Sequence, residues 1–95
     1  MKTRIIEVTN ETWGPSIVQN ATAFALQHRG GDGVELYVGE TPPAAGSLGW
    51  SLDDLEDEYG LNGLGPSDRV YLRLRAPGSS TVCVIDNGSY GHGLL

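Results

Sequence analysis

The densest group of residues that could do chemistry is an acidic run that contains Asp53, Asp54, Glu56, Asp57 and Glu58. Several carboxylate oxygens are what Ca²⁺ needs as ligands, and two carboxylates about 5–9 Å apart across a cleft are what glycoside hydrolysis needs. The run lacks the glycine and the alternating ligands of an EF-hand loop, and a chain of 95 residues offers little depth for a cleft. We therefore expect a solvated acidic surface here, with no bound metal, no cofactor and no catalytic residue.

The imidazole and thiol groups are few: His28, His92 and the single cysteine, Cys83. Structural zinc needs four nitrogen or sulfur ligands with paired spacing, which these residues do not provide. A Cys–His nucleophile pair would require the fold to bring two of them together. We expect His28 to be solvated at a strand end beside Arg29, and Cys83 to serve as a small buried apolar residue.

Aromatic side chains give a second kind of candidate site. Trp13 and Trp50, with Tyr37 or Tyr71, could stack on sugar rings as in a carbohydrate-binding module. In a small domain a tryptophan is more commonly buried or placed at an interface, because its ring has a large apolar area. Exposure of the two tryptophan rings separates these possibilities.

The elements that must position these residues are strands. Residues 34–38 and 70–75 alternate apolar and polar side chains, so that one face of each strand can enter a core. A first strand is expected over residues 4–8. We expect the glycine-rich residues 30–33 to form a tight hairpin that returns residues 34–38, and residues 81–85 to pair back onto residues 70–75.

One segment departs from the strand pattern. Ser51 could cap a first helical turn, Leu52, Leu55 and Tyr59 recur at spacings of three and four, and Gly60 could end the turn. This pattern predicts a short helix near residues 52–59. The predicted interior consists of Phe24, Leu26, Val34, Leu36, Val38, Val70, Leu72 and Leu74, completed by Val82 and Val84 or by Cys83 and Ile85.

Length and composition limit the class of protein. A chain of 95 residues with 14 glycines and 5 prolines favours one all-β domain, a small antiparallel β-sandwich of jelly-roll or immunoglobulin-like type with about 7–8 strands. The net charge of −6, with six scattered cations, argues against a nucleic-acid partner. We expect no membrane span and no signal peptide, and a single cysteine fits folding in a cytoplasm.

The order of segments resembles that of small tailed-bacteriophage virion proteins, which are β-sandwich accessory proteins of the head or tail. The resemblance is carried by Trp13 after a short strand, by Ile17-Val18-Gln19-Asn20, by Leu36-Tyr37-Val38-Gly39 before Thr41-Pro42-Pro43, and by Val70 to Ala76 with Val82-Cys83-Val84-Ile85. It covers residues 13–85, and the acidic helix expected after Trp50 departs from it. The resemblance implies no catalytic residues.

The function expected from this resemblance is that of a non-enzymatic capsid decoration or stabilising protein. Its partners would be further copies of itself, possibly as a trimer, and the major capsid protein or another virion protein. Residues 1–15 and 86–95 are expected to act as inter-subunit arms, with Trp13, Trp50, Tyr90 and Leu94 at the interface. The alternatives are a carbohydrate- or receptor-binding module of a tail or fibre, and a small enzyme that uses Cys83 or the acidic helix.

Overall fold

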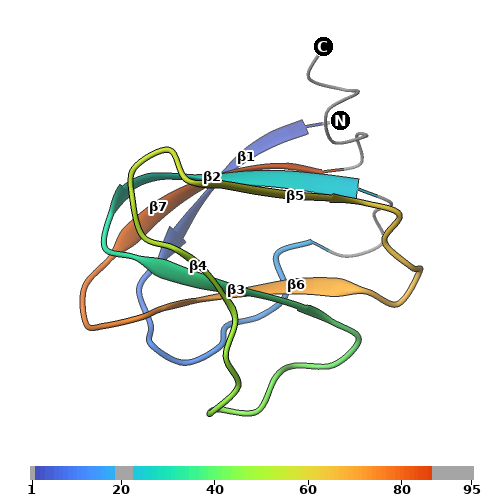
Figure 1. The fold of residues 1–95 in the computed structure, drawn as a ribbon, viewed down its shortest axis with the longest axis horizontal. Coiled ribbons are helices and arrows are strands. Elements are labelled where there is room, and N and C mark those ends of the chain that lie inside the picture. The colour runs from blue at the N-terminus through green and yellow to red at the C-terminus, as the bar shows by residue number, and fades with distance from the viewer. Residues whose placement is uncertain (1, 19–22, 87–95) are drawn as a thin grey trace.

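A computed structural model describes residues 2–18 and 23–86, and these residues form an all-β fold without a helix. Two antiparallel sheets face each other (Figure 1). The strands are β1 (Lys2–Val8), β2 (Ala23–Gly31), β3 (Val34–Gly39), β4 (Trp50–Leu52), β5 (Glu58–Asn62), β6 (Arg69–Leu74) and β7 (Ser80–Asp86). The predicted small antiparallel β-sandwich is confirmed.

The strand order shows how the chain builds the two layers. Sheet A has the order β1-β7-β2-β5, and sheet B has the order β4-β3-β6. Both predicted hairpins are therefore wrong: β2 pairs with β7 and β5 rather than with β3, and β7 pairs with β1 and β2 rather than with β6. The turns lie where the glycines predicted them, but each turn carries the chain from one sheet to the other.

The two turns lie side by side and form one corner. Asp32 donates its backbone N–H to the Ser79 carbonyl at 2.8 Å, and its carboxylate accepts the Ser79 N–H at 3.1 Å. Gly31 has a φ of 89°, and an added Cβ would overlap the backbone of Ser79. Only glycine accepts both conditions. β2–β3 and β6–β7 thus form a two-stranded ribbon that bends at this corner, a recognised way for strands to switch sheets.

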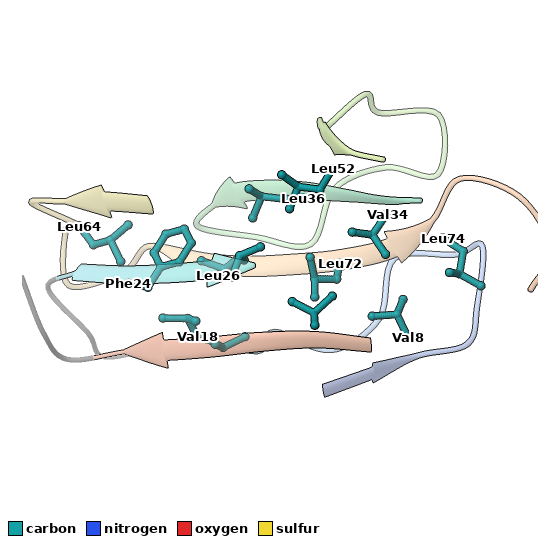
Figure 2. Packing of buried hydrophobic residues seen from close by; sticks show 13 residues of the cluster. Val8, Val18, Phe24, Leu26, Val34, Leu36, Leu52, Leu64, Leu72 and Leu74 are labelled. Carbon is teal, nitrogen blue, oxygen red and sulfur yellow. The ribbon is translucent and has the colours of Figure 1, made fainter. Parts of the chain in front are cut away.

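The core lies between the sheets and matches the alternation of the strands (Figure 2). Seven of the eight residues predicted for the interior are buried, and the eighth, Val38, is half-buried and packs against the cluster. In β7 the inward residues are Val82 and Val84, so the first of the two predicted pairs, and not Cys83 with Ile85, completes the core. Leu52, Val8, Val18 and Leu64 complete the cluster.

A segment outside the named strands covers the edge of β6. The Ile17 N–H donates to the Val70 carbonyl at 2.8 Å, the Val70 N–H to the Val18 carbonyl at 3.1 Å, and the Leu74 N–H to the Asn10 carbonyl at 2.8 Å. Residues 10–18 therefore act as an irregular fourth member of sheet B.

The predicted helix near residues 52–59 is wrong. Leu52 belongs to β4, where it pairs with Val34, and Tyr59 belongs to β5, where it pairs with Leu26. Glu56, between them, has a φ of 71°, which no right-handed helix contains. The spacing of Leu52 and Tyr59 does mark two inward residues, but they enter the interior from different sheets, whereas Leu55 is exposed. The hydrogen bonds that this segment makes with β2 and β3 are more stabilising than those of a two-turn helix, because so short a helix is marginal without tertiary packing.

The two predicted arms lie at opposite ends of the chain. Residues 2–8 form β1 within the chain's own sheet, and the contact of residues 1–15 with another copy stays a prediction. Most of the predicted arm at residues 86–95 lies outside the described residues.

Candidate binding surface

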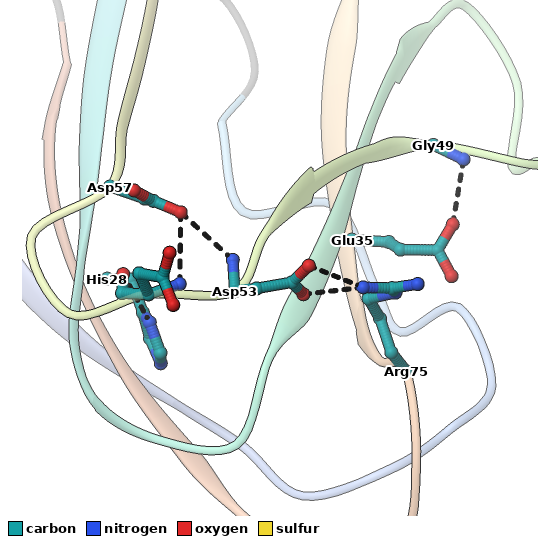
Figure 3. A network of polar contacts seen from close by, with 7 residues as sticks. His28, Glu35, Gly49, Asp53, Asp57 and Arg75 are labelled. Atoms are coloured by element: carbon teal, nitrogen blue, oxygen red, sulfur yellow. Dashed lines mark hydrogen bonds and ion pairs between the residues drawn. The ribbon is translucent and has the colours of Figure 1, made fainter.

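The acidic residues lie on a tight loop between β4 and β5. The Asp57 carboxylate accepts the backbone N–H groups of Asp53 and Asp54 at 3.1 and 3.0 Å (Figure 3). Asp53 in turn accepts a bond from Arg75 Nη1 at 2.6 Å, and this bond together with the charge attraction raises the pKa of the Arg75 guanidinium. Glu56 lies 4.0 Å from Arg29 Nη1, so three of the five carboxylates have partners inside the chain. No three acidic, histidine or cysteine side chains of the described residues converge as metal ligands.

His28 holds this acidic loop against β2. The expectation of a solvated side chain is wrong, because His28 is only 1% exposed. Its Nδ1 lies 3.0 Å from the Asp54 carbonyl oxygen, which can only accept, so Nδ1 carries the proton. Its backbone accepts the Glu56 N–H and donates to the Asp57 carbonyl, at 2.8 and 2.9 Å. The missed signal is the alternation of Phe24, Leu26 and His28, which places the imidazole on the inward face.

His28 and Cys83 do not form a nucleophile pair. His28 is paired with Val82 and faces inward, whereas Cys83 is paired with Gln27 and faces the outer side of sheet A. Adjacent residues of a strand point to opposite faces, so the sheet itself separates the two groups. Cys83 is half-buried rather than fully buried, and His92 lies outside the described residues.

Trp13 is engaged by its own chain. Its ring centroid lies 5.8 Å from that of Tyr37, and the Arg73 guanidinium lies 4.4 Å from the Trp13 ring. Its Nε1 is buried and has no protein hydrogen-bond partner among the described residues. Tyr71, another suggested sugar platform, is only 2% exposed. Trp13 and Tyr71 are therefore not free to stack on a ligand.

The residues around Trp13 form an ion-pair network that sequence reasoning missed. Arg73 Nη2 lies 3.2 Å from Glu35 Oε1, and both side chains are largely buried on the outer face of sheet B. Arg73 also donates to the carbonyls of Ala45 and Ser47 at 2.7 and 2.8 Å. Glu35 accepts the Gly49 N–H at 2.8 Å (Figure 3). These bonds fix residues 44–49 over sheet B and so determine where β4 begins. Arg73 and Glu35 are cross-strand partners, a relationship that requires knowledge of the β3–β6 register.

Trp50 is exposed, in contrast to Trp13. It is paired with the core residue Leu36, so its ring lies on the inward side of β4, and because β4 is an edge strand the ring is 62% exposed. It contacts Tyr59 of β5, with ring centroids 5.5 Å apart and planes at 52°. Tyr59 in turn contacts the buried Phe24 at 6.0 Å. These rings form a column from the core to the surface, at the open edge between the two sheets.

Two large aliphatic side chains stand on the loops at either end of β4. Leu48, which precedes β4, is 85% exposed, and Leu55, which follows it, is 63% exposed. Together with Trp50 and Tyr59 we call these residues the β4 edge surface. The sequence marks Trp50 as a candidate by its residue type but marks neither leucine, since the helical spacing assigns Leu55 to a packed face. Tyr90 and Leu94 lie outside the described residues.

A hollow of about 150 Å³ lies between β1 and the segment that follows it. The residues that line it include the apolar Ile6, Val8, Ile17 and Leu72 and the polar Asn10 and Thr12. Sites for small molecules usually measure about 300–1,000 Å³. The hollow is therefore too small to be the main candidate site.

The described residues contain no helix long and apolar enough to cross a membrane. No family model, no curated protein and no solved structure matches this chain.

Proposed function

We propose that this chain is a non-enzymatic structural protein that assembles on a larger particle, as a capsid decoration or stabilising protein of a tailed bacteriophage. The observation that carries the proposal is the β4 edge surface, where Leu48, Trp50 and Leu55 expose large apolar side chains. Burying such side chains against a partner is favourable, and three of the four large apolar side chains that are exposed in the described part of the chain lie within residues 48–55.

The arrangement of reactive groups supports a structural role. His28 and Cys83 lie on opposite faces of sheet A, and the Asp53 and Asp57 carboxylates are used in bonds within the chain. A binding surface needs no such groups. The net charge of −6 would keep unassembled copies apart in the cytoplasm where they are made. The partners would then be further copies, possibly in a trimer, and the major capsid protein or another virion protein.

The test compares two adjacent positions of β4 in full-length protein. Trp50→Asp places a charge on the β4 edge surface, whereas Ser51→Asp places the same charge on the neighbouring exposed residue of the opposite face. We expect Trp50→Asp to lower occupancy on purified particles at least tenfold and Ser51→Asp to leave it close to that of the unaltered protein. Cryo-EM gives the position and occupancy, and thermal melting shows that both variants fold.

If the Trp50→Asp variant reaches full occupancy on particles, the β4 edge surface is not part of the interface. Absence of the unaltered protein from purified particles would overturn the structural function itself.

Exposure of the Trp50 ring also favours a second candidate, a carbohydrate- or receptor-binding module of a tail or fibre. Trp50 and Tyr59 present two rings inclined at 52°, and an exposed aromatic ring can stack on the apolar face of a sugar. This candidate predicts saturable binding on a glycan array that Trp50→Ala abolishes and Leu48→Ala retains. Glycan binding without particle association would favour this candidate over assembly.

A further inference from the structure

β1 is the longest strand at an edge of the described fold. It ends sheet A and pairs with β7 through seven consecutive residue pairs, without a bulge. Seven residues span roughly 24 Å. The other terminal strands differ: β4 has three residues, β5 has five, and β6 is covered by residues 10–18. No strand of the described chain pairs with the second edge of β1.

β1 has no proline and no bulge, two of the features that usually prevent strands from pairing edge to edge. An inward-pointing charge is another such feature, and Arg4 is one, but its side chain turns back to its own chain and donates to the Ile17 carbonyl at 2.6 Å. Ile5 stands at the centre of β1 and is 63% exposed. This edge is therefore regular, with an exposed apolar side chain at its midpoint.

We propose that two copies of this chain pair through β1, antiparallel, about a two-fold axis at Ile5. Ile5 then lies opposite Ile5 of the partner subunit, and Thr3 lies opposite Glu7 of the partner subunit. Opposed residues of an antiparallel pair share one face, so this register keeps the inward faces of both sheets on the same side. A two-fold axis makes the contact self-complementary.

The charges of β1 favour the antiparallel direction. The strand has its cations at Lys2 and Arg4 and its anion at Glu7. In the antiparallel register Glu7 lies opposite Thr3 of the partner subunit and Arg4 lies opposite Ile6 of the partner subunit, so no like charges are opposed. A parallel partner in register would instead place Glu7 opposite Glu7.

The paired copies share one sheet. Sheet A has four strands, so two copies make a continuous eight-stranded sheet. The outer face of this sheet carries Ile5, with Cys83 directly opposite it on β7, and Ile85 two residues along. An apolar strip then crosses the two-fold axis. This inference deepens the proposed function and rests on it, since it names the contact between copies from which an assembly would be built.

The test uses disulfide formation between copies of the full chain in a Cys83→Ser background, which removes the native thiol opposite residue 5. Residues opposed in an antiparallel pair have Cα atoms about 4.5–5.5 Å apart, within the reach of a disulfide. We expect Ile5→Cys to give a covalent dimer under mild oxidation on a non-reducing gel. Thr3→Cys alone places its two thiols four residues apart along the pair, roughly 13 Å, and should stay monomeric.

The same register makes a second prediction, which uses two different variants. An equal mixture of Thr3→Cys and Glu7→Cys chains should cross-link, because these positions are opposed, while each variant alone should not. Leu48→Cys, on an exposed loop away from β1, controls for random collision. In sedimentation experiments Ile5→Lys should weaken self-association at least tenfold. At a concentration where both chains are monomeric its melting temperature should be unchanged, because Ile5 lies outside the core.

Failure of Ile5→Cys to cross-link in a folded chain, or equal cross-linking by Thr3→Cys alone, would overturn this inference. The result is read on purified protein without particles, so it is independent of particle occupancy. A chain that decorates particles but does not cross-link at residue 5 retains the proposed function and loses only the β1 contact.

Discussion

The Arg73 guanidinium stacks 4.4 Å from the ring of Trp13, and so the side chain that neutralises Glu35 also fixes a tryptophan over the outer face of sheet B. This one arginine joins three segments: residues 10–18, the β3–β6 pair and residues 44–49. Its position explains why only one of the two tryptophans is available to a partner.

Replacing Arg73 should therefore destabilise the fold strongly. Arg73→Met keeps much of the apolar stem but leaves Glu35 as a buried, unpaired charge, which typically costs about 3 kcal/mol. Arg75→Met is the matched control, because its pair with Asp53 is about half exposed, and pairs of this kind add little. Urea unfolding gives both values. Equal losses in the two variants would contradict the structural role of Arg73.

The core prediction is tested at Leu72. Leu72→Ala leaves a cavity in the centre of β6 and should cost about 2–5 kcal/mol of unfolding free energy. Leu48→Ala makes the same chemical change at an 85% exposed position and should have almost no effect. A loss below about 0.5 kcal/mol for Leu72→Ala, within the range typical of surface positions, would place this side chain outside the core.

The anchoring of the acidic loop is tested at His28. His28→Ala removes a buried ring and its bond to the Asp54 carbonyl, and should cost roughly 2–4 kcal/mol. His28→Asn can retain the bond, because the asparagine amide nitrogen occupies nearly the place of Nδ1. The asparagine variant should lose less stability in denaturant titrations, and protease cleavage within residues 53–57 should increase only in the alanine variant.

The corner between the sheets is tested at Gly31. Gly31→Ala combines a left-handed backbone with overlap of the Ser79 backbone, and the backbone conformation alone costs about 1–3 kcal/mol. Gly46→Ala, where an added Cβ meets nothing within 4 Å, should leave the melting temperature nearly unchanged. Similar melting temperatures for the two variants would show that the corner tolerates a side chain.

Metal independence is tested by calorimetry of the full chain. Since the Asp53 and Asp57 carboxylates are held by Arg75 and by backbone N–H groups, millimolar Ca²⁺ or EDTA should leave the melting temperature unchanged. A ligand that binds only the folded state stabilises it by RT ln(1 + L/Kd), where L is the free ligand concentration, so the melting temperature rises with the logarithm of that concentration. A rise of this form with Ca²⁺ would therefore identify the loop as a site.

The strands and most of the core could be predicted from the sequence because both follow from alternation within short windows. Val34, Leu36, Leu72 and Leu74 are each inward as their spacing requires. Strand partners could not be predicted in the same way. The turn at Gly31 is visible in the sequence, but whether it makes a hairpin or a corner depends on β7, about 50 residues later.

The candidate surface was predictable only in part. Trp50 stands out by residue type, but its exposure depends on β4 being an edge strand, and the exposure of Leu55 depends on the loop that replaces the predicted helix. Burial of His28 follows from the same alternation as Phe24 and was hidden by the adjacent Arg29 and glycines. Local pattern thus locates side chains on a strand, while sheet order decides which of them meet solvent.

The bent ribbon also has a consequence for how this chain reaches its fold. Because β3–β6 and β2–β7 are two halves of one ribbon, pairing that begins in either half can pass through the corner and set the register of the other. Pairing in either half of the ribbon must close a long loop, since β3 and β6 are separated by residues 40–68 and β2 and β7 by residues 32–79, and such closure slows folding. Folding should therefore be slow to start and cooperative afterwards, with no stage in which one sheet is complete while the other remains unpaired.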